Sequence, residues 1–112
     1  MDDATRADLR ARLEAMLAEL DRADTQTAED RKPVELDQQS VGRLSRIDAM
    51  QMQAMAEAQA GRRAAERKRI RAALARFEED EYGYCQRCGE EIEAERLRID
   101  PAAPFCVDCA RA

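Results

Sequence analysis

The chain has 112 residues, enough for one small domain or for a small domain with a helical extension. Charged residues make up 38% of the chain and Trp is absent, which disfavours a large globular core. His is also absent, which disfavours histidine-based catalysis, and the net charge of -5 disfavours non-specific DNA binding. No segment is apolar for long enough to span a membrane, and residues 1–10 are too charged for a signal peptide, so we expect a cytoplasmic protein.

The first predicted element is a helix over residues 3–29. Its apolar residues recur at alternating spacings of four and three, which is the pattern of a coiled-coil seam. They are Leu9, Leu13, Met16 and Leu20. The other faces of this helix are charged, so it requires a partner helix to cover the apolar side.

The next segment interrupts the helical pattern. Pro33 lacks a backbone N–H and disfavours helix at the residue before it. Asp37 is a favourable N-cap for a second helix over residues 38–79. We therefore predict an antiparallel helical hairpin with its tip near residues 30–40.

The apolar stripe of the second helix sets the expected pairing of the two helices. A turn near Arg31 would place the first helix against the N-terminal part of the second. The facing pairs would be Leu20 with Val41, Leu17 with Leu44 and Leu9 with Met52. We then expect residues 59–79 to extend as an arm beyond the first helix, with the C-terminal segment covering part of it.

Charge is unevenly distributed along this hairpin. Residues 62–76 carry a run of arginines and lysines with one acid, Glu66, whereas acids predominate around the predicted tip. A solvated helix face and a polar loop would account for this pattern. Insertion of the acidic tip into a partner would also account for it, and would give the long hairpin a purpose. The candidate tip residues are Asp37, Glu35 and Asp30.

Four cysteines form two Cys-x-x-Cys pairs that are separated by seventeen residues: Cys85, Cys88, Cys106 and Cys109. This is the spacing by which two tight turns hold one tetrahedral metal ion, usually Zn²⁺ and less often iron. A reducing compartment disfavours disulfides, and two pairs disfavour a redox site. Four thiolate ligands leave no coordination position for a substrate, so we predict one structural Zn²⁺ and no enzymatic activity.

The two parts define the predicted fold class. It is mainly α, an antiparallel helical hairpin or coiled coil with a small C-terminal zinc finger of four cysteine ligands. We predict the hairpin over residues 1–80 and the zinc finger over residues 81–112, packed on the base of the hairpin. The second unit is too small to fold by apolar burial alone, so metal binding supplies the missing free energy. We expect a monomer.

A distinctive sequence surrounds the cysteines. It consists of Tyr82-Gly83-Tyr84-Cys85-x-x-Cys88-Gly89-Glu90-Glu91-Ile92, then Arg96-Leu97, Pro101 and Cys106-x-x-Cys109-Ala110. Together with the preceding hairpin, these residues resemble the DksA/TraR family of bacterial transcription regulators. Residues 34–37 and 41–49 resemble a short-form subgroup of that family.

The resemblance implies a mechanism and a partner. Such proteins bind RNA polymerase and not DNA, and their coiled coil enters the secondary channel through which nucleotides reach the active site. Acidic tip residues act near the catalytic centre, and here Asp37 would lead that role. The tip departs from the family pattern Asp-x-x-Asp-x-Ala, because Asp37 is followed by Gln38, Gln39 and Ser40.

The resemblance also implies a candidate small ligand. Positions that serve the alarmone (ppGpp) site of the family fall on Arg62 and Arg69, which are otherwise candidate contacts to the rim of the channel.

Two other functions remain open from the residues alone. A nucleic-acid-binding zinc ribbon would use the arginines around the cysteines, although acids outnumber them there. A non-catalytic adaptor protein would dimerise through the exposed face of residues 59–69.

Overall fold

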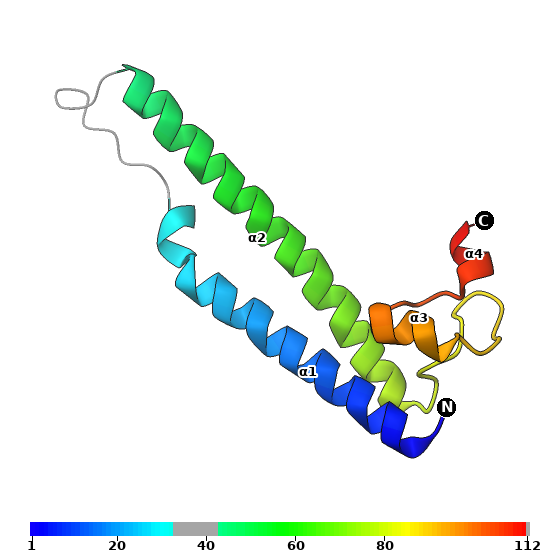
Figure 1. Cartoon of the computed structure of the whole chain (residues 1–112). Coiled ribbons are helices and arrows are strands. Elements are labelled where there is room, and N and C mark those ends of the chain that lie inside the picture. Colours follow the sequence, from blue (N-terminus) through cyan, green and yellow to red (C-terminus); the bar gives the residue numbers. More distant parts are fainter. Residues whose placement is uncertain (33–42, 112) are drawn as a thin grey trace.

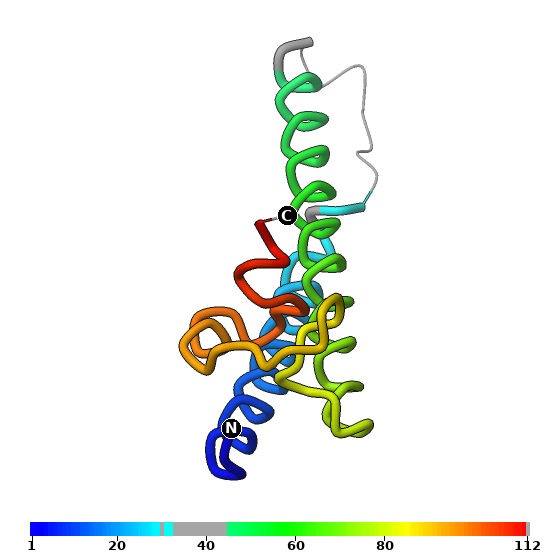
Figure 2. Tube along the Cα trace, turned by 90° about the vertical axis from the view of Figure 1, so that its right-hand side faces the viewer, coloured from blue at the N-terminus to red at the C-terminus, as the bar shows by residue number. Residues whose placement is uncertain are grey.

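The computed structural model describes residues 1–32 and 43–111, apart from the side chains of Asp30, Arg43 and Leu44. Its elements are, in chain order, α1 (Asp3–Gln26), the 3-10 helix η1 (Ala28–Arg31), α2 (Arg43–Glu78), α3 (Ala94–Ile99) and α4 (Val107–Arg111). The helices α1 and α2 run antiparallel, side by side (Figures 1 and 2). The C-terminal module, residues 82–111, packs near the end of α2, so the mainly helical hairpin with an added module is confirmed.

The first helix begins and ends at side-chain caps. Asp2 precedes it, and the Asp2 Oδ1 atom accepts a hydrogen bond from the Thr5 N–H at 2.7 Å. After Gln26, the Thr27 hydroxyl donates to the Ala23 carbonyl at 2.7 Å, and the chain tightens into η1. The helix therefore ends before the predicted boundary at residue 29.

The second helix is the longest element. Its described part spans 36 residues, or about 54 Å, and the predicted residues 38–42 lie outside the described part. It ends at Glu78 because Asp80 adopts a left-handed conformation (φ 56°) and the Glu81 N–H bonds the Arg76 carbonyl at 2.8 Å. No helix within residues 1–32 and 43–111 is both long and apolar enough to cross a membrane.

One apolar cluster joins both helices and the C-terminal module. Leu9 and Leu13 of α1 are fully buried in it. The other fully or nearly fully buried members come from α2 and from the module: Ile70, Ala73, Phe77, Tyr82, Cys85, Ile92, Leu97, Ala102 and Ala103. The core thus lies where three segments meet, and neither the hairpin nor the module encloses it alone.

The predicted pairing of the helices was wrong. Leu9 lies in the cluster with Ile70 and Phe77, whereas Met52, its expected neighbour, is 71% exposed. The Arg10 Nη2 atom is 2.6 Å from Glu78 Oε1, so α1 runs along the C-terminal half of α2. The segment that we expected to extend as an arm is therefore the segment that α1 covers. Of the other expected pairs, Val41 and the side chain of Leu44 lie outside the described residues.

Polar contacts around Asp24 explain this register. Its Oδ1 accepts from Arg63 Nε at 2.7 Å, and Oδ2 accepts from Arg67. Arg31 Nη2 donates to the Asp24 carbonyl at 2.9 Å, and Arg67 Nε also contacts Asp21 Oδ1 at 2.9 Å. Charge-assisted bonds of this kind are directional, so they fix which turns of α1 and α2 face each other. We call these five residues the Asp24 cluster.

The Asp24 cluster makes the hairpin sensitive to acid. The guanidinium groups of Arg63 and Arg67 lower the pKa of Asp24 from 3.8 to about 2. A lowered folded-state pKa adds stability above about pH 4 that is lost as the pH falls toward 2. We therefore expect Asp24→Asn to lower the melting temperature at pH 7, with the gap to the parent closing between pH 4 and pH 2.

Thermal unfolding of both proteins across this pH range measures the effect. Asp8→Asn is the matched control, because Asp8 is an exposed carboxylate on the same helix and has no ion pair among the described residues. An Asp24→Asn protein that melts with the parent at pH 7 would show that the cluster does not hold the helices together.

Candidate functional site

The first cysteine pair lies in a tight turn that follows α2. The Cys85 N–H donates to the Glu90 carbonyl at 2.8 Å, and the Ile92 N–H donates to the Gly83 carbonyl at 2.7 Å. At the turn itself, the Gly89 N–H bonds the Cys85 carbonyl at 3.0 Å, with Gly89 at a φ of 78°. A side chain would be strained at that φ, which explains glycine after the second cysteine.

The second cysteine pair lies at the start of α4. Cys106 immediately precedes α4 and Cys109 lies within it, and the Ala110 N–H bonds the Cys106 carbonyl at 2.9 Å. The Gln86 N–H reaches the Pro104 carbonyl at 2.9 Å and so ties the first turn to the second. Backbone contacts therefore bring together two pairs that are far apart in sequence.

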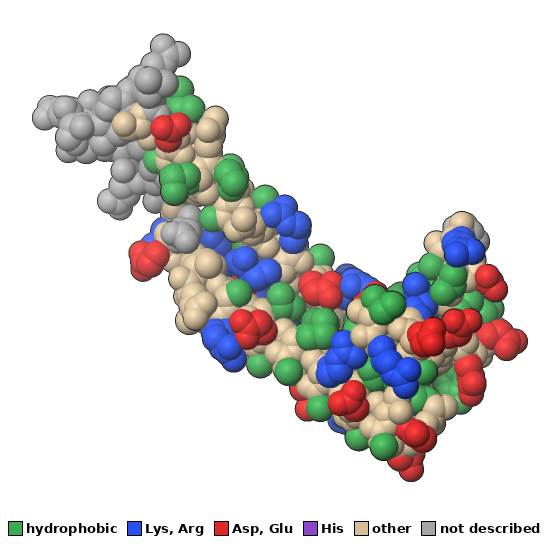
Figure 3. Space-filling view, viewed as in Figure 1, with side chains coloured by type: hydrophobic (Ala, Val, Ile, Leu, Met, Phe, Trp, Pro, Cys, Tyr) green, Lys and Arg blue, Asp and Glu red, His purple; other side chains and the backbone are tan. Residues whose placement is uncertain are grey.

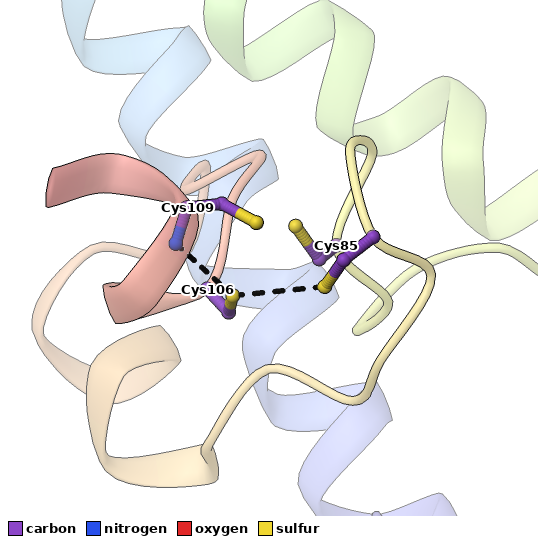
Figure 4. A group of neighbouring side chains, drawn as sticks. Cys85, Cys106 and Cys109 are labelled. Carbon is purple, nitrogen blue, oxygen red and sulfur yellow. Dashed lines mark hydrogen bonds between the residues drawn. The ribbon is translucent and has the colours of Figure 1, made fainter. Parts of the chain in front are cut away.

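The four sulfur atoms form a cluster of the size that a zinc ion requires. All of them lie within 4.8 Å of one another, and Cys88 Sγ is 3.8 Å from Cys106 Sγ. A tetrahedron with Zn–S bonds of about 2.3 Å has edges of about 3.8 Å. The side chains of Cys85, Cys106 and Cys109 point toward a shared space (Figure 4).

The electrostatics of the cluster suit a bound cation. The nearby Cys106 raises the pKa of Cys109 to about 12, with burial as a further cause. Burial alone would raise the pKa of Cys85 as well, but backbone N–H groups, that of Cys88 first, lower it to about 6. Four thiolates so close together need a positive ion between them. The cluster therefore holds one structural Zn²⁺, and with four protein ligands it has no catalytic position.

Tyr82 connects the zinc module to the hairpin. Its ring stacks on Phe77 of α2, with ring centroids 3.9 Å apart and planes 15° apart. Its hydroxyl donates to the Pro101 carbonyl at 2.8 Å, and burial raises its pKa to about 12. One side chain thus contacts both α2 and the chain segment that leads to the second cysteine pair.

Two arginines add polar links between the same parts. Arg12 Nη2 of α1 donates to the Arg98 carbonyl at 2.8 Å. Arg69 Nη2 of α2 bonds Asp100 Oδ2 at 2.8 Å, and its Nη1 bonds Glu66 at 2.8 Å. The module is therefore held in a defined orientation on the hairpin.

The residues predicted to face a partner are only partly described. Glu35 and Asp37 lie outside the described residues, and Asp30 belongs to η1 but its side chain is not described. Arg62 is exposed and makes no ion pair within the described ranges, whereas Arg69 is paired twice. The two arginines lie seven residues apart in α2 and therefore on one face of the helix, and their role as contacts to a partner or to ppGpp stays a prediction.

Sequence reasoning missed the partners of the basic run. Arg63 and Arg67 lie four residues apart, and Asp21 and Asp24 lie three apart, so each pair occupies one helix face. Matching those two faces would have suggested the observed register. Nothing in the sequence marked Tyr82 as the link to Pro101, because that contact depends on the folded zinc module.

Known proteins resemble this chain in two ways, the first of which concerns the C-terminal module. Residues 80–112 match the family model described as prokaryotic dksA/traR C4-type zinc finger. The "RNA polymerase-binding transcription factor DksA" of Haemophilus influenzae is 48% identical over 42 residues, which are 38% of this chain and 29% of that protein. The protein of the same name from Escherichia coli K12 is 43% identical over 42 residues. The match therefore spans less than a third of the length of these relatives.

The second similarity concerns the whole fold. The solved structure of transcription factor DksA2 from Pseudomonas aeruginosa aligns with a TM-score of 0.74 and 21% identity. The alignment covers 99% of this chain and 84% of that one. The arrangement of a helical hairpin with a small C-terminal module thus occurs in a solved structure.

Proposed function

We propose that the protein is a transcription regulator that binds RNA polymerase, because its C-terminal module matches the dksA/traR C4-type zinc-finger family model. The observation that carries this proposal is the zinc module itself, since the relatives that match it are named RNA polymerase-binding factors. The fold supports it, because the same combination of hairpin and module occurs in a solved transcription factor.

The shape of the molecule suits a protein that reaches into its partner. It measures 64 × 29 × 21 Å, and the zinc module broadens only one end. The hairpin would enter the secondary channel of the polymerase, with the acidic residues of the tip acting near the active site. The structural zinc would hold the broad end outside and fix its angle to the hairpin. Such a role would place the protein in the cytoplasm.

A pull-down tests this function directly. Purified protein is mixed with purified bacterial RNA polymerase, and the complex is isolated and analysed for zinc. Binding with one zinc per chain supports the proposal, and added DNA should not compete. No binding to polymerase would refute it, and tight binding to DNA alone would favour a nucleic-acid-binding ribbon.

Asp37 is the leading candidate for regulatory action at the tip. We predict that Asp37→Asn leaves the affinity for polymerase nearly unchanged but weakens the effect of the protein on transcription, because the carboxylate charge is lost where the tip acts. In vitro transcription with parent and variant measures this. Glu79→Gln, an exposed acid just beyond the other end of α2, is the matched control. If Asp37→Asn regulates transcription as well as the parent does, Asp37 has no part in the mechanism, and Glu35 and Asp30 become the next residues to replace.

The basic run gives less support to the alternative functions. Arg63 and Arg67 already bind Asp24 within the chain, so they offer little charge to nucleic acid phosphates. A ppGpp molecule at Arg69 would compete with Asp100 and Glu66, which already pair with this guanidinium. These internal pairs favour a protein-binding role over an anion-binding one.

A further inference from the structure

The zinc module carries an isoleucine in a position that folding does not explain. Ile99, the last residue of α3, is 86% exposed, which is the highest value for a large apolar side chain in the described part of the chain. Leu97, two residues earlier, is fully buried and accounts for the packing of that helix. A single exposed aliphatic side chain is ordinary on a protein surface, but this one lines a groove, and an apolar side chain in a groove is a suitable contact for another molecule.

A groove lies beside this isoleucine. It has a volume of about 270 Å³, and its walls come from α3, the segments next to it and the start of α4. The lining residues are Glu93, Glu95, Arg96, Ile99, Asp100 and Val107. Ile99 and the partly buried Val107 give the groove an apolar part large enough for one aliphatic side chain.

The charges that line the groove are negative on balance. Glu93 and Glu95 are exposed and form no ion pair within the described residues. Asp100 is neutralised by Arg69, and the one cation of the groove, Arg96, donates its Nε to the Phe105 carbonyl at 2.8 Å. Acidic side chains also gather on the face of the module seen in Figure 3. The apolar surface is therefore bordered by two carboxylates, Glu93 and Glu95, that make no ion pair within the described residues, against the single guanidinium of Arg96.

We propose that this groove binds a protein segment in which an aliphatic side chain stands next to a lysine or arginine. The aliphatic group would cover Ile99 and Val107, and the cation would pair with Glu93 or Glu95. The inference rests on the proposed function, since RNA polymerase is the partner expected to supply the segment. It adds a contact at the broad end of the molecule, far from the tip.

Binding of purified RNA polymerase to three variants tests the groove. Ile99→Ala should weaken binding about tenfold, because the contact loses the burial of most of one side chain. The double variant Glu93→Gln/Glu95→Gln should weaken binding and reduce its dependence on salt. Glu79→Gln/Glu90→Gln, which removes two exposed carboxylates outside the groove, should bind as the parent does. Because Ile99 is so exposed, its replacement should leave the melting temperature unchanged, which a thermal melt checks.

The possible results distinguish failure of the groove proposal from failure of the proposed function. If the parent binds polymerase and Ile99→Ala binds equally well, the groove proposal fails and the function stands. If both double variants weaken binding to the same extent, diffuse charge and not the groove is responsible, and the proposal again fails. If the parent does not bind polymerase, the proposed function fails and the groove proposal with it. Sedimentation of the protein alone tests whether a second copy of the chain occupies the groove instead. A parent that is a dimer and an Ile99→Ala variant that is a monomer would show this and would overturn the proposal.

Discussion

Removal of zinc is expected to unfold residues 82–111 and to loosen the hairpin end that they cover. Structural zinc contributes on the order of 10 kcal/mol to small modules of this kind, and the helices α3 and α4 have only six and five residues. The effect should spread, because Leu97 and Ala103 of the module share one core with Leu9 and Ile70. Loss of the module would expose these hairpin side chains to water.

Chelation with EDTA, followed by ¹⁵N NMR of the full chain, measures this effect. Amide signals of the module should lose their dispersion, and signals of residues 5–16 should shift or broaden. Replacement of one ligand, Cys106→Ser, should reproduce the change, whereas returning one equivalent of Zn²⁺ to the parent should reverse it. A metal-free protein with the spectrum of the zinc form would contradict the structural role of the ion.

Truncation of Tyr82 should be the most damaging single change outside the cysteines. Tyr82→Ala removes the stack on Phe77 and leaves a cavity in the core, and such aromatic-to-alanine changes lower the free energy of unfolding by about 3–5 kcal/mol. Tyr82→Phe keeps the ring and removes only the hydroxyl that bonds Pro101. We expect this change to lower the free energy of unfolding by about 1 kcal/mol.

Urea unfolding of parent and both variants, at equal zinc concentration, distinguishes the two contributions. The alanine variant should also release zinc more readily, because Tyr82 stands three residues before the first ligand and orients that turn on α2. If both variants lower the free energy of unfolding by the same small amount, Tyr82 does not link the module to the hairpin.

The metal site was predictable because its determinants are local. Two residues between the cysteines of each pair fix the turns, and Gly89 supplies the required positive φ, so no long-range information was needed. The same holds for the helices, because their apolar spacing and the break at Pro33 between them indicated their existence.

The register of the hairpin could not be predicted in the same way. A seam of leucines and alanines fits several shifted partners almost equally well, so apolar spacing alone does not choose among them. The selection comes from Asp24 with Arg63 and Arg67, and from the module, whose side chains complete the core around Ile70. The matching charges could have been found in the sequence, but the packing around Ile70 depends on the folded module, and so does the exposure of Ile99 at the end of α3.

The composition of the core has a consequence for how the chain is made. Leu9 and Leu13 are translated early, but the residues that bury them lie between Ile70 and Ala103. Translation adds roughly 5–20 residues per second. The first helix therefore lacks most of its packing partners for several seconds, until residues 70–103 have left the ribosome. Packing of α1 is therefore expected to wait until residues 70–103 have been made, and binding of zinc by Cys106 and Cys109 would follow.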